Sequence, residues 1–249
     1  MIEKTLYIGD VHGDFEGMEA LAKFVLSEHR DVLRIVVVGD FGFYPNYSKA
    51  SWYLKSSLSI PVCFLDGNHE NHVMLNHDVC LPPTKKSPCF DALHISRGWV
   101  ENNILYVGGA RTMRRGRLIP GFDHFPEEEI RMSHCIRALD AIENSNINVM
   151  VSHDVPESAI QNILRSPPLA DQSRGILERL FTAAAPRLVV SGHHHRHRMF
   201  EHRDASFVSL RNIDCFHFEI VQADRYTDLI GIANECCLIG DNLGRTYEI

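Results

Sequence analysis

Aspartate and histidine side chains recur at the ends of apolar runs along this 249-residue sequence. The opening case is the segment GDVHGD, where Asp10, His12 and Asp14 crowd together directly after an apolar run. Carboxylates that lie so close repel one another unless a positive charge lies between them. Later runs end in the same way, and the residues that follow them are Asp40, Asn68, His69, His153, His193 and His195.

These residue types indicate a metal site. Carboxylate and amide oxygens mixed with imidazoles suit manganese, iron or zinc, whereas the thiolates typical of structural zinc sites are absent from every group. The donors outnumber what one ion needs, so the sequence predicts two divalent ions. The alternative for each residue alone is a structural role, because Gly-Asp pairs are ordinary turn residues. The recurrence at five successive strand ends favours metal binding.

The pattern of apolar residues predicts the elements that position these groups. Strand-like runs are expected at 5–10, 33–40, 61–70, 104–110, 147–154 and 187–195, and helices at 15–28, 48–58, 126–143, 157–165 and 173–184. From about residue 206 the short β-rich runs predict antiparallel strands without helix. Residues 80–92 are expected to form a long loop that departs from this regular alternation of strands and helices. Continuous apolar strands separated by helices indicate a parallel sheet covered on both faces. The carboxyl ends of such strands share one edge, where the groups would meet.

Composition and charge limit the functional classes. A net charge of −7 argues against general nucleic-acid binding. Arginine-rich clusters at 111–117 and 196–203 are compatible with a small anionic substrate or with solvated surface charge. The sequence has no apolar span of about 18 residues, the length that would predict a membrane helix. It also has no signal-peptide pattern, so a cytoplasmic location is expected. The seven cysteines form no C-x-x-C pair, which predicts reduced, mostly buried thiols. Oligomeric state is not readable from these features.

The order and spacing of the groups resemble the motifs of the calcineurin-like metallophosphoesterases. Those motifs read D-x-H, G-D, G-N-H-[DE], H and G-H-x-H, and the similarity extends over residues 10–195. The resemblance implies an α/β fold with four αββα layers, in which helices flank two mixed β-sheets. Because no linker or repeat interrupts the sequence, we expect a single domain over 1–249.

The resemblance also implies a role for each residue. The ligands of a first ion would be Asp10, His12 and His195, and those of a second ion would be Asn68, His153 and His193. Asp40 would bridge two divalent ions, with manganese preferred over iron or zinc. His69 would contact the phosphate and protonate or orient the leaving oxygen. Asp14 would serve as a loop or helix-capping residue, and His194 would not be a ligand.

The second motif departs from that of the protein Ser/Thr phosphatases, G-D-x-x-D-R-G. This sequence reads GDFGFYP, so Phe43 and Tyr44 replace the Asp-Arg pair. Arg111 is the candidate replacement for binding phosphate, and Asp66 or Asp154 for orienting His69. The aromatic residues could line a substrate pocket, or Phe41 and Phe43 could pack beneath the site.

The function expected from these features is hydrolysis of a small phosphate ester, either a phosphodiester or a nucleotide. The nucleophile would be a hydroxide that bridges the two metal ions. A phosphoprotein phosphatase is the alternative enzyme. A non-catalytic scaffold is disfavoured, because all eight ligand and catalytic positions of the resemblance are intact.

Overall fold

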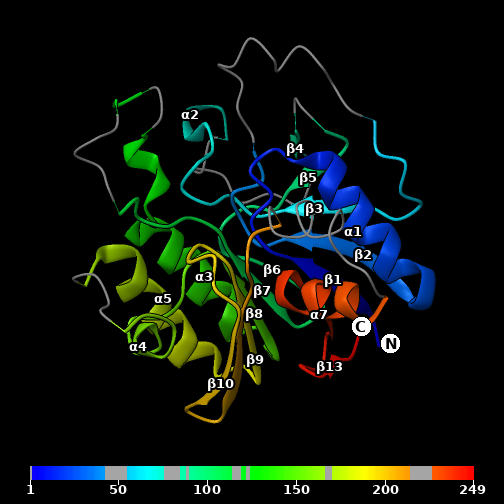
Figure 1. Cartoon of the computed structure of the whole chain (residues 1–249). Helices are drawn as coiled ribbons and strands as arrows, with labels where there is room; N and C mark the ends of the chain where they lie inside the picture. The colour runs from blue at the N-terminus through cyan, green and yellow to red at the C-terminus, as the bar shows by residue number, and fades with distance from the viewer. Residues whose placement is uncertain are drawn as a thin grey trace.

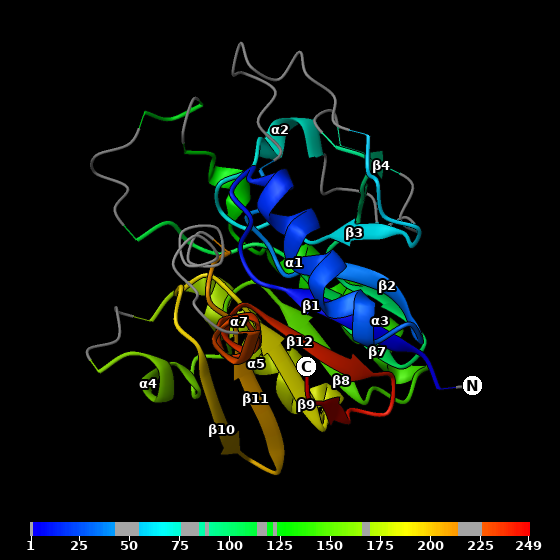
Figure 2. The ribbon, with the colours of Figure 1, turned by 45° about the vertical axis from the view of Figure 1, so that its right-hand side comes forward.

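Two mixed β-sheets lie face to face, and helices cover their outer faces (Figures 1 and 2). The computed structural model describes residues 2–42, 55–75, 85–87, 90–113, 119–121, 124–165, 170–213 and 226–249. This is the four-layer αββα arrangement that the resemblance implied, so the fold prediction is confirmed.

The first sheet has the strand order β13-β12-β1-β2-β3-β5-β4. Its strands are β1 (Lys4–Ile8), β2 (Val32–Val37), β3 (Val62–Phe64), β4 (Lys85–Lys86), β5 (Leu93–His94), β12 (Cys237–Asp241) and β13 (Thr246–Tyr247). The central strands β1, β2, β3 and β5 are parallel, as the alternation of strands and helices predicted. The strand β12 pairs antiparallel with β1, so the end of the chain lies beside its beginning.

The second sheet has the order β10-β11-β9-β8-β7-β6. Its strands are β6 (Trp99–Glu101), β7 (Ile104–Val107), β8 (Val149–Ser152), β9 (Leu188–Ser191), β10 (Arg198–His202) and β11 (Ala205–Ser209). The strands β7, β8, β9 and β11 are parallel, and β6 and β10 add antiparallel edges.

Alternate residues of the central strands pack into different layers. Leu6 and Ile8 of β1 join the cluster on the outer face of the first sheet, whereas Tyr7 lies between the sheets. In β8, Met150 packs toward the outer helices and Val151 lies between the sheets. Both faces of these strands are buried, which explains why their sequences read as unbroken apolar runs.

The helices pack on the two outer faces. The first sheet is covered by α1 (Phe15–Glu28) and α7 (Tyr226–Cys236), and the second by α3 (Met132–Glu143) and α5 (Gln172–Ala184). The connections between these elements contain α2 (His72–Leu75), α4 (Ile160–Ile163) and the 3-10 turn η3 (Pro126–Glu128). The Asp14 side chain caps α1 by accepting a hydrogen bond from the Gly17 backbone N–H at 2.9 Å. The capping role predicted for Asp14 is therefore confirmed. None of the described helices has the length and hydropathy needed to cross a membrane.

Three element predictions were wrong in part. Residues 55–58 are not helical, although they end the helix predicted at 48–58, whose other residues lie outside the described ranges. The helix predicted at 126–143 is divided into η3 and α3, because the residue that follows η3, Glu129, is extended. Most of the long loop predicted at 80–92 also lies outside the described ranges.

The third error concerns the tail, where only strands were expected. Helix α7 occupies 226–236 and packs Ala233 and Cys236 against the first sheet, with Ile232 partly buried beside them. Their spacing of three or four residues is helical. Antiparallel pairing of the tail is nevertheless present in β12 and β13.

Candidate metal centre

The residues singled out in the sequence follow parallel strands of both sheets. Asp10 and His12 come after β1, Asp40 after β2, Asn68 and His69 after β3, His153 after β8, and His193 and His195 after β9. Because these strands run in parallel within each sheet, their carboxyl ends share one edge, where loops from distant parts of the chain meet. The structure brings the side chains of seven of the eight together in shared clusters or direct contacts, and His69 lies at their rim.

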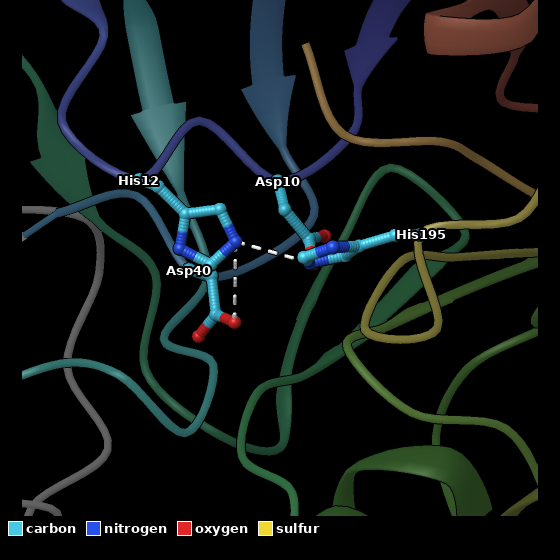
Figure 3. A group of neighbouring side chains, drawn as sticks. All are labelled: Asp10, His12, Asp40 and His195. Carbon is cyan, nitrogen blue, oxygen red and sulfur yellow. Dashed lines mark hydrogen bonds and ion pairs between the residues drawn. The ribbon is translucent and has the colours of Figure 1, made fainter. Parts of the chain in front are cut away.

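One group consists of Asp10, His12, Asp40 and His195, whose side chains point toward one another (Figure 3). The His12 and His195 Nε2 atoms lie 3.0 Å apart, and the His195 Nε2 lies 3.0 Å from an Asp10 carboxylate oxygen. The His12 Nε2 is 4.0 Å from Asp40 Oδ2. All four ligand-type atoms lie within 4.8 Å of one another, close enough to bind a single ion.

A second group consists of Asp40, His153 and His193. The His153 Nε2 lies 3.4 Å from Asp40 Oδ2 and 3.3 Å from the Asn68 side-chain oxygen. All of these side chains are buried. Asp40 thus belongs to both groups, and its Oδ2 lies within 4.0 Å of an imidazole nitrogen from each, His12 and His153.

The backbone at this site is strained. His12, Asp40, His193 and His195 all have positive φ angles, of 50°, 44°, 66° and 51°. Residues other than glycine rarely adopt positive φ angles, and each such residue costs on the order of 1–2 kcal/mol of folding free energy. Such strain gathers at functional sites, where the surrounding fold holds a side chain in a direction that regular structure would not give.

The electrostatics of the site favour a cation. Burial raises the pKa of the Asp10 carboxyl, but the neighbouring His153 and His195 lower it below its ordinary value. Burial also raises the pKa of Asp40, and the surrounding histidines, chiefly His153, hold it well below that value. Burial alone lowers the pKa of His153, yet Asp40 and Asp10 raise it to about 10. Two ionised, buried carboxylates therefore create a negative potential that stabilises positive charge between them.

The donor set suits divalent ions. Burial lowers the pKa of His193 to about 3, so its imidazole is neutral and available as a ligand at neutral pH. Both groups consist of carboxylate and imidazole donors, and no cysteine of the described residues belongs to either. Cys63, Cys135 and Cys237 are instead free thiols, and all three are buried, as is Cys236. The residues present thus match divalent ions such as manganese, iron or zinc.

A third group, Asp154, His193 and His194, is less suited to an ion. The His194 Nε2 lies 2.9 Å from Asp154 Oδ1, and Arg174 Nη1 approaches the other carboxylate oxygen at 3.8 Å. Asp154 therefore already has cationic and hydrogen-bonding partners. This contact places the His194 ring on Asp154, and its exclusion from the ligand set stays a prediction.

His69 and Arg111 are exposed at this edge. The His69 backbone N–H donates to Asp40 Oδ1 at 2.9 Å, and its ring lies 5.5 Å from the His12 ring, centroid to centroid. Arg111 lies in the loop after β7, and the next residue, Thr112, accepts a hydrogen bond from the Asn68 side chain. Both residues are therefore near the two groups and face solvent.

The aspartates expected to orient His69 have other partners. Asp66 accepts two hydrogen bonds from Arg97 and one from His94, and Asp154 binds His194. The His69 hydrogen bond that the structure describes is made by its backbone to Asp40.

The aromatic residues of the second motif are described in part. Phe41 is fully buried beneath the site, where it stacks on Phe64 with a centroid separation of 4.4 Å. This agrees with the packing interpretation for Phe41. Phe43 and Tyr44 lie outside the described residues.

Sequence reasoning missed a set of buried polar residues beside the site. Glu70 accepts hydrogen bonds from the Gly42 and Gly67 backbone N–H groups, which ties the loop that carries Asp40 to the loop that carries Asn68. The glutamate in the G-N-H-E motif was a signal for this contact. Thr112 and Glu128 belong to no motif, so their spacing offered no such signal.

Comparisons with known proteins show similarity to one family and to several solved structures. A family model described as calcineurin-like phosphoesterase matches residues 3–197. No curated protein matches the sequence. One solved structure, 11% identical, superimposes with a TM-score of 0.53 over 99% of this chain and 98% of its own.

Two further structures are similar at comparable identity. A Staphylococcus aureus protein assigned as a putative 5′-nucleotidase is 12% identical with a TM-score of 0.51, and the match covers 86% of this chain but 49% of that one. The protein TT1561 of Thermus thermophilus is 13% identical with a TM-score of 0.48, covering 86% of this chain and 91% of its own. At such identities, a TM-score above 0.5 supports a shared fold and no particular substrate.

Proposed function

Because the chain belongs to the calcineurin-like phosphoesterase family, we propose that it hydrolyses a small phosphate ester, a phosphodiester or a nucleotide, with two bound divalent ions. The observation that carries this proposal is the membership of Asp40 in both Asp/His groups. A carboxylate shared by two clusters of ligand-type atoms is the arrangement that a two-metal hydrolase needs.

The ligand assignment follows the two groups. Asp10, His12 and His195 would hold the first ion, and Asn68, His153 and His193 would hold the second. Asp40 would contact both. We assign manganese as the preferred ion from the mixed oxygen and imidazole donors.

Bound divalent ions would polarise the phosphoryl group and lower the pKa of water, which makes hydrolysis feasible near neutral pH. The residues of the chain would do the remaining work. His69 is exposed beside His12, so its imidazole can reach a bound phosphate and give a proton to the leaving oxygen. Arg111, exposed in the loop beside Asn68, would add a guanidinium to the phosphoryl oxygens.

A substrate panel tests this proposal. The purified protein is loaded with Mn²⁺ and assayed for kcat/KM on bis-p-nitrophenyl phosphate, a nucleotide monoester and a phosphoserine peptide. We expect the diester or the nucleotide to exceed the phosphopeptide, since Phe43 and Tyr44 replace the Asp-Arg pair of the protein phosphatases.

Two results would contradict the proposal. A phosphopeptide favoured by tenfold, about 1.4 kcal/mol of transition-state preference, would indicate a phosphoprotein phosphatase instead. No metal-dependent turnover on any of the three substrates would contradict the enzymatic function itself.

A further inference from the structure

The Asn68 side chain is held at both of its ends. Its oxygen lies 3.3 Å from His153 Nε2, within the proposed second metal site. Its nitrogen donates to the Thr112 hydroxyl at 3.1 Å. An amide presents an oxygen at one end and an NH₂ group at the other, so a half-turn of the side chain would aim a donor at the metal site in place of a ligand.

The partners of Thr112 decide which way the amide faces. Glu128 is fully buried and accepts two hydrogen bonds from Thr112, from the backbone N–H to Oε1 and from the hydroxyl to Oε2, each at 2.8 Å. A carboxylate accepts and does not donate, so the single hydroxyl proton of Thr112 is committed to Glu128. The hydroxyl oxygen can then only accept from Asn68, which fixes the NH₂ end toward Thr112 and the oxygen toward His153.

Glu128 is itself anchored to the strand end that carries Asn68. Arg97, which is buried, donates from Nη2 to the Glu128 carbonyl at 3.0 Å and from Nη1 to the Glu129 carbonyl at 2.9 Å. The same guanidinium donates from Nε and Nη2 to Asp66 at 2.8 and 2.6 Å. Asp66 lies two residues before Asn68, so the contacts form a closed loop of polar side chains behind the site.

We infer that Thr112 and Glu128 are positioning residues that set the direction of the Asn68 amide and thereby the affinity of the second metal site. The inference rests on the proposed two-metal function. It assigns a role to two residues outside every ligand motif, one from the loop after β7 and one from η3. Loss of hydrogen-bonding partners behind a ligand typically reduces metal affinity about 10–100-fold.

Equilibrium Mn²⁺ binding, followed by the electron paramagnetic resonance signal of the free ion, tests this inference. Metal-free wild type should bind two ions. Thr112→Val removes the hydroxyl at nearly constant volume and should weaken one ion about 10–100-fold while the other keeps its affinity. Thr112→Ser, which restores the hydroxyl, should restore binding. Thr182→Val is the matched control, because it removes a hydroxyl that donates to the Glu178 carbonyl at an exposed position of α5.

Glu128→Gln provides a second variant that does not depend on Thr112. The glutamine oxygen would accept the hydrogen bond from the Thr112 backbone N–H, so the glutamine NH₂ group would donate to the Thr112 hydroxyl oxygen. The Thr112 hydroxyl proton would then be free to donate to Asn68, which favours the reversed orientation of the Asn68 amide. We expect the same loss of one ion with a metal-free Tm close to that of wild type. A purely structural role would instead lower the Tm and leave both affinities unchanged.

The outcomes separate the two proposals. Wild type that binds fewer than two Mn²⁺ ions would contradict the proposed function and the inference together. Wild type that binds two ions, with Thr112→Val and Glu128→Gln binding both as tightly, would overturn the inference alone. An equal loss of Mn²⁺ affinity in Thr112→Ser and Thr112→Val would also overturn the inference, because the hydroxyl would then not affect metal binding.

Discussion

At the scale of single residues, the site combines strained backbone with paired charge. Four residues of the two Asp/His groups have positive φ angles, and two buried carboxylates lie between imidazoles. The residue types were predictable from the sequence, because Asp, Asn and His after apolar runs are chemically distinctive. The bond from Thr112 to Asn68 was not, since threonine is common and 44 residues separate the two.

His69→Ala should lower kcat about 10²–10⁴-fold, because a general acid would be lost, while two Mn²⁺ ions still bind. His29→Ala is the control, since His29 lies at the C-terminal end of α1, opposite the end that Asp14 caps. Steady-state kinetics with metal analysis of the same samples decides this. Full turnover in His69→Ala, or loss of its metal ions, would show that the role is wrong.

At the scale of elements, tight turns after the strands aim the side chains. Periodicity predicted the helices α1 and α5 and the strands that carry the ligands, because buried faces impose regular spacing. Division of the strands into two sheets did not follow from periodicity, because a strand covered by helices on both faces and one covered by a helix and a sheet are equally apolar. The resemblance to a family supplied that information.

Gly39 illustrates how closely these turns pack. Its φ is +126°, and a Cβ there would lie 2.1 Å from His153 Nδ1. Gly39→Ala should therefore displace the His153 ring, weaken one Mn²⁺ site and destabilise the fold by about 2–3 kcal/mol. Gly175→Ala in α5, where a Cβ meets nothing within 4 Å, should instead stabilise by about 0.5–1 kcal/mol. Urea unfolding and Mn²⁺ titration of both variants measure this, and an undisturbed site in Gly39→Ala would contradict it.

At the scale of the whole molecule, the C-terminal segment lies outside the matched region of residues 3–197 and packs against the strand and loop that carry Asp10. The Ile213 backbone N–H donates to the Asp10 carbonyl at 3.0 Å, and the Gly9 N–H donates to the Cys236 carbonyl at 2.8 Å. The strand β12 then pairs with β1 along its whole length. Sequence patterns missed α7 in this segment, although Ile232, Ala233 and Cys236 have helical spacing, because strand-like runs flank them.

Asp241 stabilises the turn that joins β12 to β13. Its carboxylate accepts hydrogen bonds from the Leu243 and Arg245 backbones, the Arg245 side chain and the Tyr247 hydroxyl. Burial raises the pKa of Asp241, but these bonds outweigh it and lower the pKa below 3.8. Asp241→Asn should cost about 1–2 kcal/mol of unfolding free energy at pH 7.

The lowered pKa gives this cost a pH dependence. A depressed carboxyl pKa contributes stability that is present above the unfolded value of 3.8 and is lost as the pH falls through the folded value. The difference in unfolding free energy between wild type and Asp241→Asn should therefore stay at about 1–2 kcal/mol from about pH 5 to 8. It should shrink below about pH 4. Urea unfolding of metal-free protein measures it, with Asp140→Asn at an exposed position of α3 as the control. A difference that grew in acid would contradict the assignment.

Anomalous scattering from crystals of the Mn²⁺-loaded protein tests whether two divalent ions share Asp40. We expect two anomalous peaks, with the Asp40 carboxylate contacting both. One ion would be bound by Asp10, His12 and His195, and the other by Asn68, His153 and His193. A single peak, no peak, or two peaks of which only one contacts Asp40 would contradict this expectation.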